Sequence, residues 1–217
     1  MLHRRAGAHN LHVAMGELRI LLASASPRRR ELLAADGIDF TVGPVPVDEN
    51  LGEFSDPARA AVELATRKAL AAASARAERG EEWVVLGADT IVALERTGRW
   101  ELLGKAEDER EADAMLASLS GTRHEVITGV CVVRTHDLSR WSAFERTAVT
   151  MREITAEERA AYVASGEWRD KAGGYAIQES ADRFVTALQG GGFDNVVGLP
   201  VALAKALLRR AGAALAP

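Results

Sequence analysis

The chain has 217 residues, of which 47% are hydrophobic and 27% are charged, and its formal net charge is -4. This length allows a sizeable core, and the proportions are ordinary for a globular protein and exclude a disordered or collagen-like chain. The weakly acidic total disfavours extended nucleic-acid binding, which needs a basic face. We therefore expect no nucleic-acid partner, although a local group of cations can still bind a small anion.

The sequence lacks the patterns of membrane insertion and secretion. No apolar stretch approaches the roughly 18 residues of a membrane span. Residues 1–16 carry three His and two Arg without a continuous apolar core, so we interpret them as an N-terminal extension and not as a secretory signal. Residues 17–217 are expected to form a single cytoplasmic domain that binds no membrane, with Cys131 as a buried hydrophobic residue.

The N-terminal half alternates strand and helix patterns. The apolar run at residues 18–23 predicts a buried strand. Ser26-Pro27 then predicts a helix start, with the serine capping free amides and the proline at the first helical position. That helix is expected to end before Gly37. A second strand is predicted at residues 38–42, followed by an Ala-rich helix from Ser55-Asp56-Pro57 to about Arg79.

The rest of the chain is richer in strands. Two strand-like runs, 83–88 and 91–94, are predicted with an interruption at Ala88-Asp89-Thr90. The later elements are, in chain order, strands at 100–103, 126–133 and 141–151 and helices at 107–119, 155–165 and 199–211. Together these elements predict an α/β domain with a mixed sheet.

Lysine is unusually rare among the basic residues. Of 27 cations, 23 are Arg and only four are Lys, namely Lys68, Lys105, Lys171 and Lys205. A chain that favours arginine this strongly is expected to keep lysine where a guanidinium does not fit, because an ammonium binds phosphate as a compact point charge. The alternative is that these lysines are solvated, as most lysines are.

The first candidate site follows the first strand, at Ser24-Ala25-Ser26-Pro27-Arg28-Arg29. Two hydroxyls precede a helix whose first turn carries arginines. Free amides at a helix N-terminus attract anions, whereas an arginine in the first turn opposes the helix dipole. The pattern favours an anion site, with a capped helix and solvated arginines as the alternative.

The second candidate is Asp89, which lies beside Thr90 in an apolar stretch. A carboxylate there is costly to desolvate unless it is paired or binds a metal, and it can also deprotonate a water molecule. The alternative is an aspartate that breaks the strand and caps a turn. Glu31, Asp48 and Glu49 are either further carboxylates near a metal such as Mg²⁺ or surface acids.

A third cluster runs from Asp170 to Gln178. Its small residues allow close approach of the backbone to a ligand, and Gln178 offers a donor and an acceptor to a nucleobase edge. A glycine loop with a surface amide is the alternative. The P-loop, GxGxxG, HExxH and GxSxG signatures are all missing, so a phosphate site has to be built in another way.

These motifs stand in the order of the Maf family, which the chain resembles over roughly residues 18 to 210. Eight ordered blocks are a more specific signal than any one of them. Two departures are that Ala106 replaces the usual proline and that no glycine follows Gln178. The blocks are Leu22–Arg29, Val47–Glu49, Leu64-Ala65 with Lys68-Ala69, Gly87–Thr90, Leu103–Lys105, Leu119–Gly121, Asp170–Gly173 and Val196–Pro200.

The resemblance implies a nucleoside triphosphate pyrophosphatase, which cleaves between the α and β phosphates and releases a nucleoside monophosphate and pyrophosphate. It implies an elongated mixed β-sheet with flanking helices, two lobes around a nucleotide-binding cleft, and a homodimer. Asp89 matches the family's proton acceptor. Arg28, Thr90 and Gln178 match the positions linked to substrate choice, and this set resembles the dTTP/UTP branch.

The resemblance and the residues together lead to a mechanistic hypothesis. A divalent cation, Mg²⁺ or Mn²⁺, is expected on the triphosphate and on carboxylates drawn from Asp89, Glu49 and Glu31. Asp89 is expected to activate the attacking water. The residues expected to contact phosphate are Ser24, Arg28, Lys68 and Lys105, with Lys171 on the phosphate or supporting its loop, while Thr90 and Gln178 read the pyrimidine.

Two other functions remain open from the sequence alone. One is a nucleotide-binding regulator of septum formation with little turnover, which the set of Asp89, Lys68 and Lys105 disfavours. The other is a pyrophosphatase for other nucleotides, such as 7-methyl-GTP or purine nucleotides.

Overall fold

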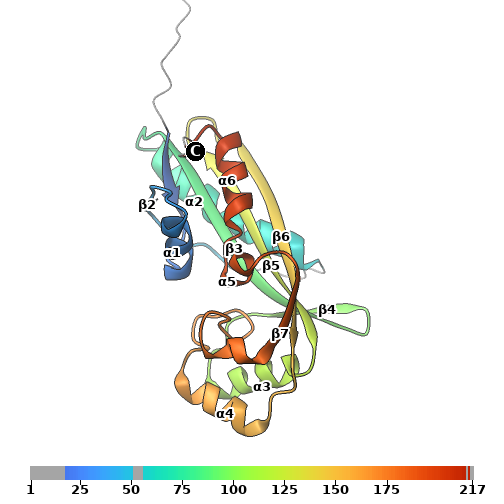
Figure 1. The fold of residues 1–217 in the computed structure, drawn as a ribbon. Coiled ribbons are helices and arrows are strands. Elements are labelled where there is room, and N and C mark those ends of the chain that lie inside the picture. Colours follow the sequence, from blue (N-terminus) through green and yellow to red (C-terminus); the bar gives the residue numbers. More distant parts are fainter. Residues whose placement is uncertain (1–17, 51–55, 214, 216–217) are drawn as a thin grey trace, which may run out of the picture.

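The computed structural model describes residues 18–50, 56–213 and 215, and the expected extension at residues 1–16 lies outside these ranges. Within them, helices flank a mixed sheet of seven strands in the order β2-β1-β3-β5-β6-β7, with β4 paired to β3 off this path. The predicted α/β class is confirmed. Figure 1 shows the long strands β3, β5 and β6 running through the molecule, with helices gathered around both of their ends.

The first half of the chain builds the parallel part of the sheet. Strand β1 (Arg19–Leu22) pairs in parallel with β2 (Thr41–Val42) and with β3 (Trp83–Arg96). The connections carry helices α1 (Pro27–Ala35) and α2 (Pro57–Ala77), so both predicted helices are confirmed. The second strand is shorter than predicted.

Antiparallel pairs complete the sheet. Strand β3 pairs with β4 and β5, β5 pairs with β6, and β6 pairs with β7. The three strands predicted here are confirmed, and each begins one to three residues earlier than expected. The bounds of the four strands are β4 (Arg99–Leu103), β5 (Arg123–Arg134), β6 (Arg140–Met151) and β7 (Val185–Gly190).

The remaining helices include two elements that the sequence did not predict, a 3-10 helix and α5, and β7 was also missed. The two helical elements span five residues each, which is too short to show a helical period. The residues of β7 (VTALQG) do not alternate strictly between apolar and polar. Among the described residues, no helix is long and apolar enough to cross a membrane. The helices are α3 (Glu109–Leu119), α4 (Ala156–Ser165), η1 (Ser180–Phe184), α5 (Phe193–Val197) and α6 (Val201–Arg210).

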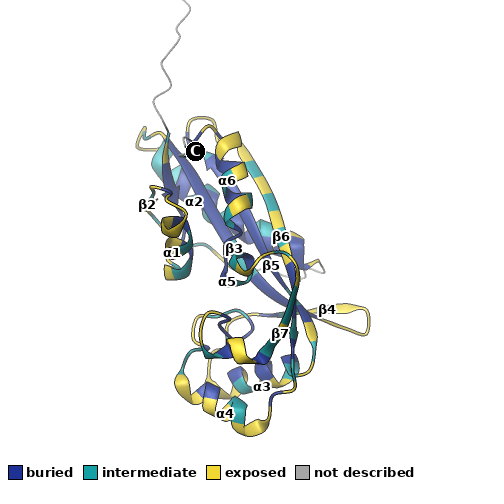
Figure 2. Ribbon diagram, in the orientation of Figure 1, coloured by how far each residue is buried: buried dark blue, intermediate teal, exposed yellow. Residues whose placement is uncertain are grey.

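Helices cover both faces of the sheet, which explains why its strands read as continuous apolar runs. Successive β3 residues alternate between faces, so that Val85 packs with α2 while Val84 and Leu86 pack with α1 and α6. A separate apolar cluster joins α3, α4 and η1 to the other end of the strands. Figure 2 shows β3 and β5 buried along most of their length.

The predicted interruption of β3 at Ala88-Asp89-Thr90 is wrong. The strand continues through these residues because β5 pairs with all of them, with Asp89 opposite Gly129 and Thr90 opposite Thr128. On the other edge, the β1 ladder reaches only to Leu86 and the β4 ladder begins at Val92. Asp89 and Thr90 therefore lie where one edge of β3 has no strand neighbour among the described strands.

Helix α2 approaches the sheet unusually closely at two glycines. A Cβ atom placed on Gly87 would lie 2.5 Å from the carbonyl oxygen of Ala65, and one placed on Gly129 would lie 2.5 Å from the amide nitrogen of Val62. Both neighbours are helix backbone, which cannot turn aside as a side chain can. The hydrogen atoms of these glycines are therefore what allow α2 to lie directly on β3 and β5.

Substitution Gly129→Ala is expected to destabilise the fold by about 3 kcal/mol or more, because the added methyl group forces the α2 backbone away from the sheet. The melting temperature measured by circular dichroism tests this. Gly104→Ala is the matched control, since nothing lies within 4 Å of its added Cβ. Equal melting temperatures for the two variants would contradict the close approach.

Candidate active site

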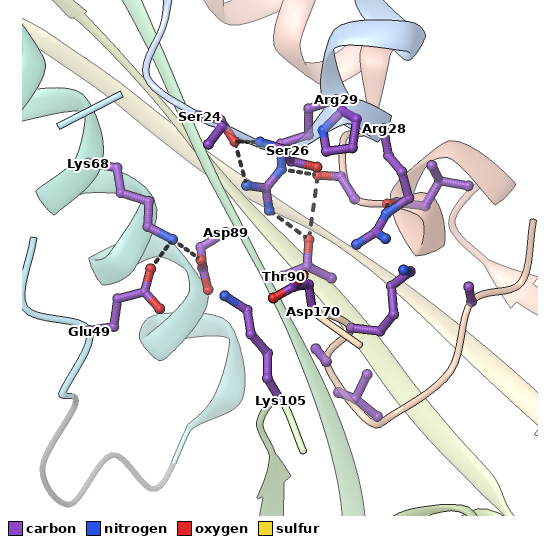
Figure 3. A pocket seen from close by; sticks show the side chains of 18 of the residues that line it. Ser24, Ser26, Arg28, Arg29, Glu49, Lys68, Asp89, Thr90, Lys105 and Asp170 are labelled. Atoms are coloured by element: carbon purple, nitrogen blue, oxygen red, sulfur yellow. Dashed lines mark hydrogen bonds and ion pairs between the residues drawn. The ribbon is translucent and has the colours of Figure 1, made fainter. Parts of the chain in front are cut away.

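The unpaired edge of β3 opens into a pocket of about 750 Å³. Figure 3 shows that Asp89 and Thr90 leave the strand in different directions, Asp89 towards Lys68 on α2 and Thr90 towards the residues at the start of α1. All predicted site residues except Glu31 and Asp48 line this pocket, although they come from distant parts of the chain. The lining residues predicted from the sequence are Ser24, Arg28, Glu49, Lys68, Asp89, Thr90, Lys105, Lys171 and Gln178.

Lys68 holds two carboxylates on the α2 side of the pocket. Its Nζ lies 2.5 Å from Asp89 Oδ1 and 2.7 Å from Glu49 Oε1. The Lys68 and Asp89 side chains are only 15% and 13% exposed, so their charges are mutually neutralised with little help from water. Burial by itself raises the pKa of Glu49, but the hydrogen bond to Lys68 and the nearby positive charges outweigh it and lower that pKa.

Three further cations face the pocket in addition to Lys68. Lys105 is exposed and extends into the pocket towards Asp89 (Figure 3). Lys171 Nζ donates to the carbonyl oxygen of Arg169 and lies 3.9 Å from Glu179. Arg28 is half-buried and donates from Nε to the carbonyl oxygen of Val197 at 3.3 Å. Burial lowers the pKa of both Arg28 and Lys171, because removal from water disfavours the charged form.

Sequence reasoning did not single out Arg29, which forms the buried wall on the other side. Its Nε donates to the carbonyl oxygen of Gly198 at 2.8 Å, its Nη1 to Ser24 Oγ at 3.1 Å and its Nη2 to Thr90 Oγ1 at 3.2 Å. Burial lowers its pKa. The sequence alone does not distinguish Arg28 from Arg29, because both are arginines in the first turn of α1. The packing of α1 against the chain at Gly198 distinguishes them.

The expected cap at the start of α1 is wrong, because the Ser26 side chain makes no capping hydrogen bond. Instead Ser24 Oγ accepts from the Ser26 backbone amide at 3.3 Å and from Arg29. The arginines of the first turn are not simply solvated either. One is half-buried at the pocket and the other is inside the protein.

The segment from residue 170 to 178 forms the wall opposite α1 and is tied down at several points. Lys105 and Ala172 form an isolated β-bridge, and the Gly173 amide donates to the carbonyl oxygen of Gly104 at 2.8 Å. Gly173 has φ 71, and an added Cβ would lie 3.0 Å from Val92. This glycine thus allows close approach to the protein itself, while Gln178 lines the pocket and is exposed.

His124 supports the same segment from behind. Its Nε2 is 2.9 Å from the hydroxyl of Tyr175, a residue that lines the pocket. The two rings meet edge to face. Among the described residues, the buried Nδ1 of His124 has no hydrogen-bond partner, and burial lowers the pKa of His124 to about 4. The ring is therefore neutral at neutral pH.

The carboxylates near the pocket limit where a metal can bind. Glu31 is exposed on α1 and does not line the pocket, and Asp48 accepts from the Asn50 amide and does not line it either. No group of three or more His, Cys, Asp or Glu side chains positioned for a metal occurs in the described ranges. Asp89 and Glu49 fit the alternative pattern, in which Mg²⁺ uses one or two carboxylates and completes its shell with substrate phosphates.

Fold and pocket together define an α/β protein with cations and carboxylates facing one another across an unpaired strand edge. The chain belongs to the Maf family: the family model described as "Maf-like protein" matches residues 19–211. The resemblance stated from the eight sequence blocks is thereby confirmed.

Several relatives cover nearly the whole chain. It is 45% identical over 183 residues to a dTTP/UTP pyrophosphatase of Bacillus thuringiensis subsp. konkukian. This alignment covers 84% of this chain and 90% of the relative. A Bacillus cereus protein of the same name is 43% identical over 93% of this chain and 91% of its own length. One from Thermoanaerobacter sp. is 42% identical over 89% of this chain and 96% of its own length.

The low pKa of His124 predicts a loss of stability in acid. The unfolded chain takes up the proton near pH 6.5 and the folded protein only near pH 4, so stability falls as the pH drops through this window, by about 2 kcal/mol between pH 7 and 5. Urea unfolding at both pH values measures this. His124→Gln should remove most of the difference, whereas His136→Gln, in the exposed turn after β5, should not; a wild-type response from His124→Gln would refute the assignment.

Proposed function

We propose that this protein is a nucleoside triphosphate pyrophosphatase that hydrolyses dTTP and UTP to the nucleoside monophosphate and pyrophosphate. The observation that carries the proposal is the pairing of Asp89 with Lys68 in a pocket that also holds Arg28, Lys105 and Lys171. A polyanion is attracted by the cations, and a carboxylate is at hand to activate water. Membership of the Maf family and relatives named dTTP/UTP pyrophosphatases support the same reaction.

The pocket residues divide the work by position. Asp89 accepts a proton from a water molecule whose oxygen bonds to the α-phosphorus, while the bond from that phosphorus to the oxygen bridging to the β-phosphate breaks and pyrophosphate leaves. Lys68 fixes the direction in which the Asp89 carboxylate points. Lys105, Arg28 and Ser24 bind phosphate oxygens and stabilise the leaving pyrophosphate.

A divalent cation, Mg²⁺ or Mn²⁺, completes this site in the proposal. Asp89 and Glu49 would hold it together with the triphosphate, since both carboxylates lie on the same side of the pocket. When bound, it neutralises negative charge on the phosphates. Glu31 has no part in this set because it lies outside the pocket.

The base is read on the other side of the pocket. Thr90 and Gln178 line this side and are the side chains proposed to contact the pyrimidine, with Lys171 supporting the segment that carries Gln178. The pocket lies between the helices gathered at the two ends of β3 (Figure 1), which are proposed to be the two lobes of a nucleotide-binding cleft. The homodimer stays a prediction, which size-exclusion chromatography with light scattering tests.

Purified protein with Mg²⁺ and a panel of nucleoside triphosphates tests the function. Release of pyrophosphate from dTTP and UTP is expected, and release of orthophosphate would refute cleavage between the α and β phosphates. Binding without turnover would favour the alternative of a nucleotide-binding regulator.

Asp89→Asn is expected to lower kcat on dTTP by about a thousandfold, because an amide cannot accept the proton of the attacking water. The matched control is Asp36→Asn, which alters another carboxylate paired with a lysine, at 2.6 Å from Lys205 and away from the pocket. This control should retain full activity. Substantial turnover by Asp89→Asn would exclude Asp89 as the proton acceptor.

Lys68→Arg and Lys105→Arg are each expected to lower kcat/KM by roughly tenfold or more, although the charge is kept. A guanidinium is broader than an ammonium and approaches its partners in a plane, so it cannot take the position of Lys68 between two carboxylates 2.5 and 2.7 Å away. Lys205→Arg serves as the control and should behave like the wild type. Unchanged kinetics for Lys68→Arg would show that any cation suffices there.

A further inference from the structure

The hydroxyl of Thr90 lies in a chain of hydrogen bonds whose direction can be worked out. Arg29 Nη2 lies 3.2 Å from Thr90 Oγ1, and because a guanidinium has no acceptor, Thr90 accepts this bond. On its other side Thr90 Oγ1 is 3.0 Å from Thr128 Oγ1. A hydroxyl has one hydrogen to donate and two lone pairs that can accept. The direction of the second bond therefore decides whether Thr90 can donate to a ligand or only accept from it.

That direction is set one step further on. Thr128 Oγ1 is 2.9 Å from the carbonyl oxygen of Asn195, which can only accept, so Thr128 spends its hydrogen there. Thr128 must then accept from Thr90. The other acceptor recorded for Thr90 among the described residues is the carbonyl oxygen of Gly198 at 3.4 Å, a longer contact to a residue that borders the pocket and already accepts from Arg29. Thr128 at 3.0 Å is the nearer acceptor and is fully buried, so the Thr90 hydrogen is directed into the protein.

Burial shields these hydrogen bonds from bulk water, so their directions are set by the protein groups. Thr128 and Asn195 are fully buried, and Arg29 is 9% exposed. Thr90 itself lines the pocket. The Thr90 hydroxyl accepts from Arg29 with one lone pair and donates its hydrogen to a protein acceptor. Its second lone pair is therefore what Thr90 can offer to a ligand. Towards the pocket it is an acceptor and never a donor.

Arg29 has the opposite effect on Ser24, which it leaves as a hydrogen-bond donor towards the pocket. Ser24 Oγ accepts from Arg29 Nη1 at 3.1 Å and from the Ser26 amide at 3.3 Å, which uses both of its lone pairs. Among the described residues, no acceptor is recorded for its own hydrogen. Ser24 also lines the pocket, so it can donate to an anionic oxygen. One buried guanidinium thus sets a donor and an acceptor on the same wall.

We infer that Arg29 and Thr128 are positioning residues that select the pyrimidine base by fixing Thr90 as an acceptor. This inference rests on the proposed function, in which Thr90 contacts the base. Uracil and thymine carry a hydrogen on ring nitrogen 3 and can donate to Thr90. Cytosine presents a lone pair at the same position and would leave two acceptors facing each other, which a site built for one hydrogen bond rejects.

The test compares kcat/KM for UTP and CTP in the wild type, Thr128→Val and Thr128→Ser. The wild type is expected to favour UTP. Valine keeps the shape of threonine but cannot accept the Thr90 hydrogen. The remaining protein acceptor is then the Gly198 carbonyl oxygen, a longer contact of 3.4 Å that already accepts from Arg29, so the hydrogen can turn to a ligand instead. The UTP to CTP ratio should therefore fall by about tenfold, the effect of one misdirected hydrogen bond. Serine keeps the hydroxyl and should keep the wild-type ratio.

A double-mutant cycle separates positioning from a general structural effect. In a Thr90→Val background, where there is no hydroxyl to direct, Thr128→Val should leave the UTP to CTP ratio unchanged. Should Thr128→Val not fold, Thr128→Ala removes the same hydroxyl and carries the same expectation. Melting temperatures of all variants identify losses that are due to unfolding.

The outcomes distinguish the inference from the proposed function. If the wild type releases no pyrophosphate from any nucleotide, the proposed function fails. If it hydrolyses UTP and CTP equally well, or if Thr128→Val lowers kcat for both without changing their ratio, only the inference is overturned. A lower UTP to CTP ratio in Thr128→Val, together with a wild-type ratio in Thr128→Ser, supports the inference.

Discussion

The site depends on one close approach, that of helix α2 to the sheet at Gly87 and Gly129. A side chain at either glycine would collide with the helix backbone. Without this approach, Lys68 on α2 could not reach Asp89 on β3 at 2.5 Å and still hold Glu49, which comes from a different segment. The stability of the fold and the geometry of the ion pair are therefore set by the same contact.

Strand β3 turns this contact into a pocket because its two edges differ. Continuous pairing with β5 keeps the strand unbroken through Asp89 and Thr90, while the opposite edge is left open between the β1 and β4 ladders. Strand alternation sends the two side chains to different faces. Each finds its own partner, Lys68 for Asp89 and Arg29 for Thr90, so a ligand touching both lies across the strand edge.

Much of this was predictable from local signals, and the failures have a common cause. The longer helices, the long strands and nine residues that line the pocket followed from period, capping and motif. The break at Asp89, the cap at Ser26 and the missing role of Arg29 each depend on contacts that only the packing of the chain creates. Strand β5 pairs through Asp89, and the carbonyl of Gly198 binds Arg29, although both partners are distant in sequence. Arg29 in turn binds Ser24, whose hydroxyl accepts from the Ser26 amide in place of the expected cap.

The rarity of lysine also acquires a physical meaning. Lys68, Lys105 and Lys171 line the pocket, whereas Lys205 pairs with Asp36 outside it. The site arginines donate to backbone carbonyls, Arg28 to Val197 and Arg29 to Gly198, and so tie α1 to a distant segment with their several donors. Lys68 instead holds two carboxylates, and Lys105 extends into the pocket with no hydrogen bond or ion pair to a side chain recorded among the described residues. Lysine thus supplies compact charges inside the pocket, and arginine ties down the wall beside it.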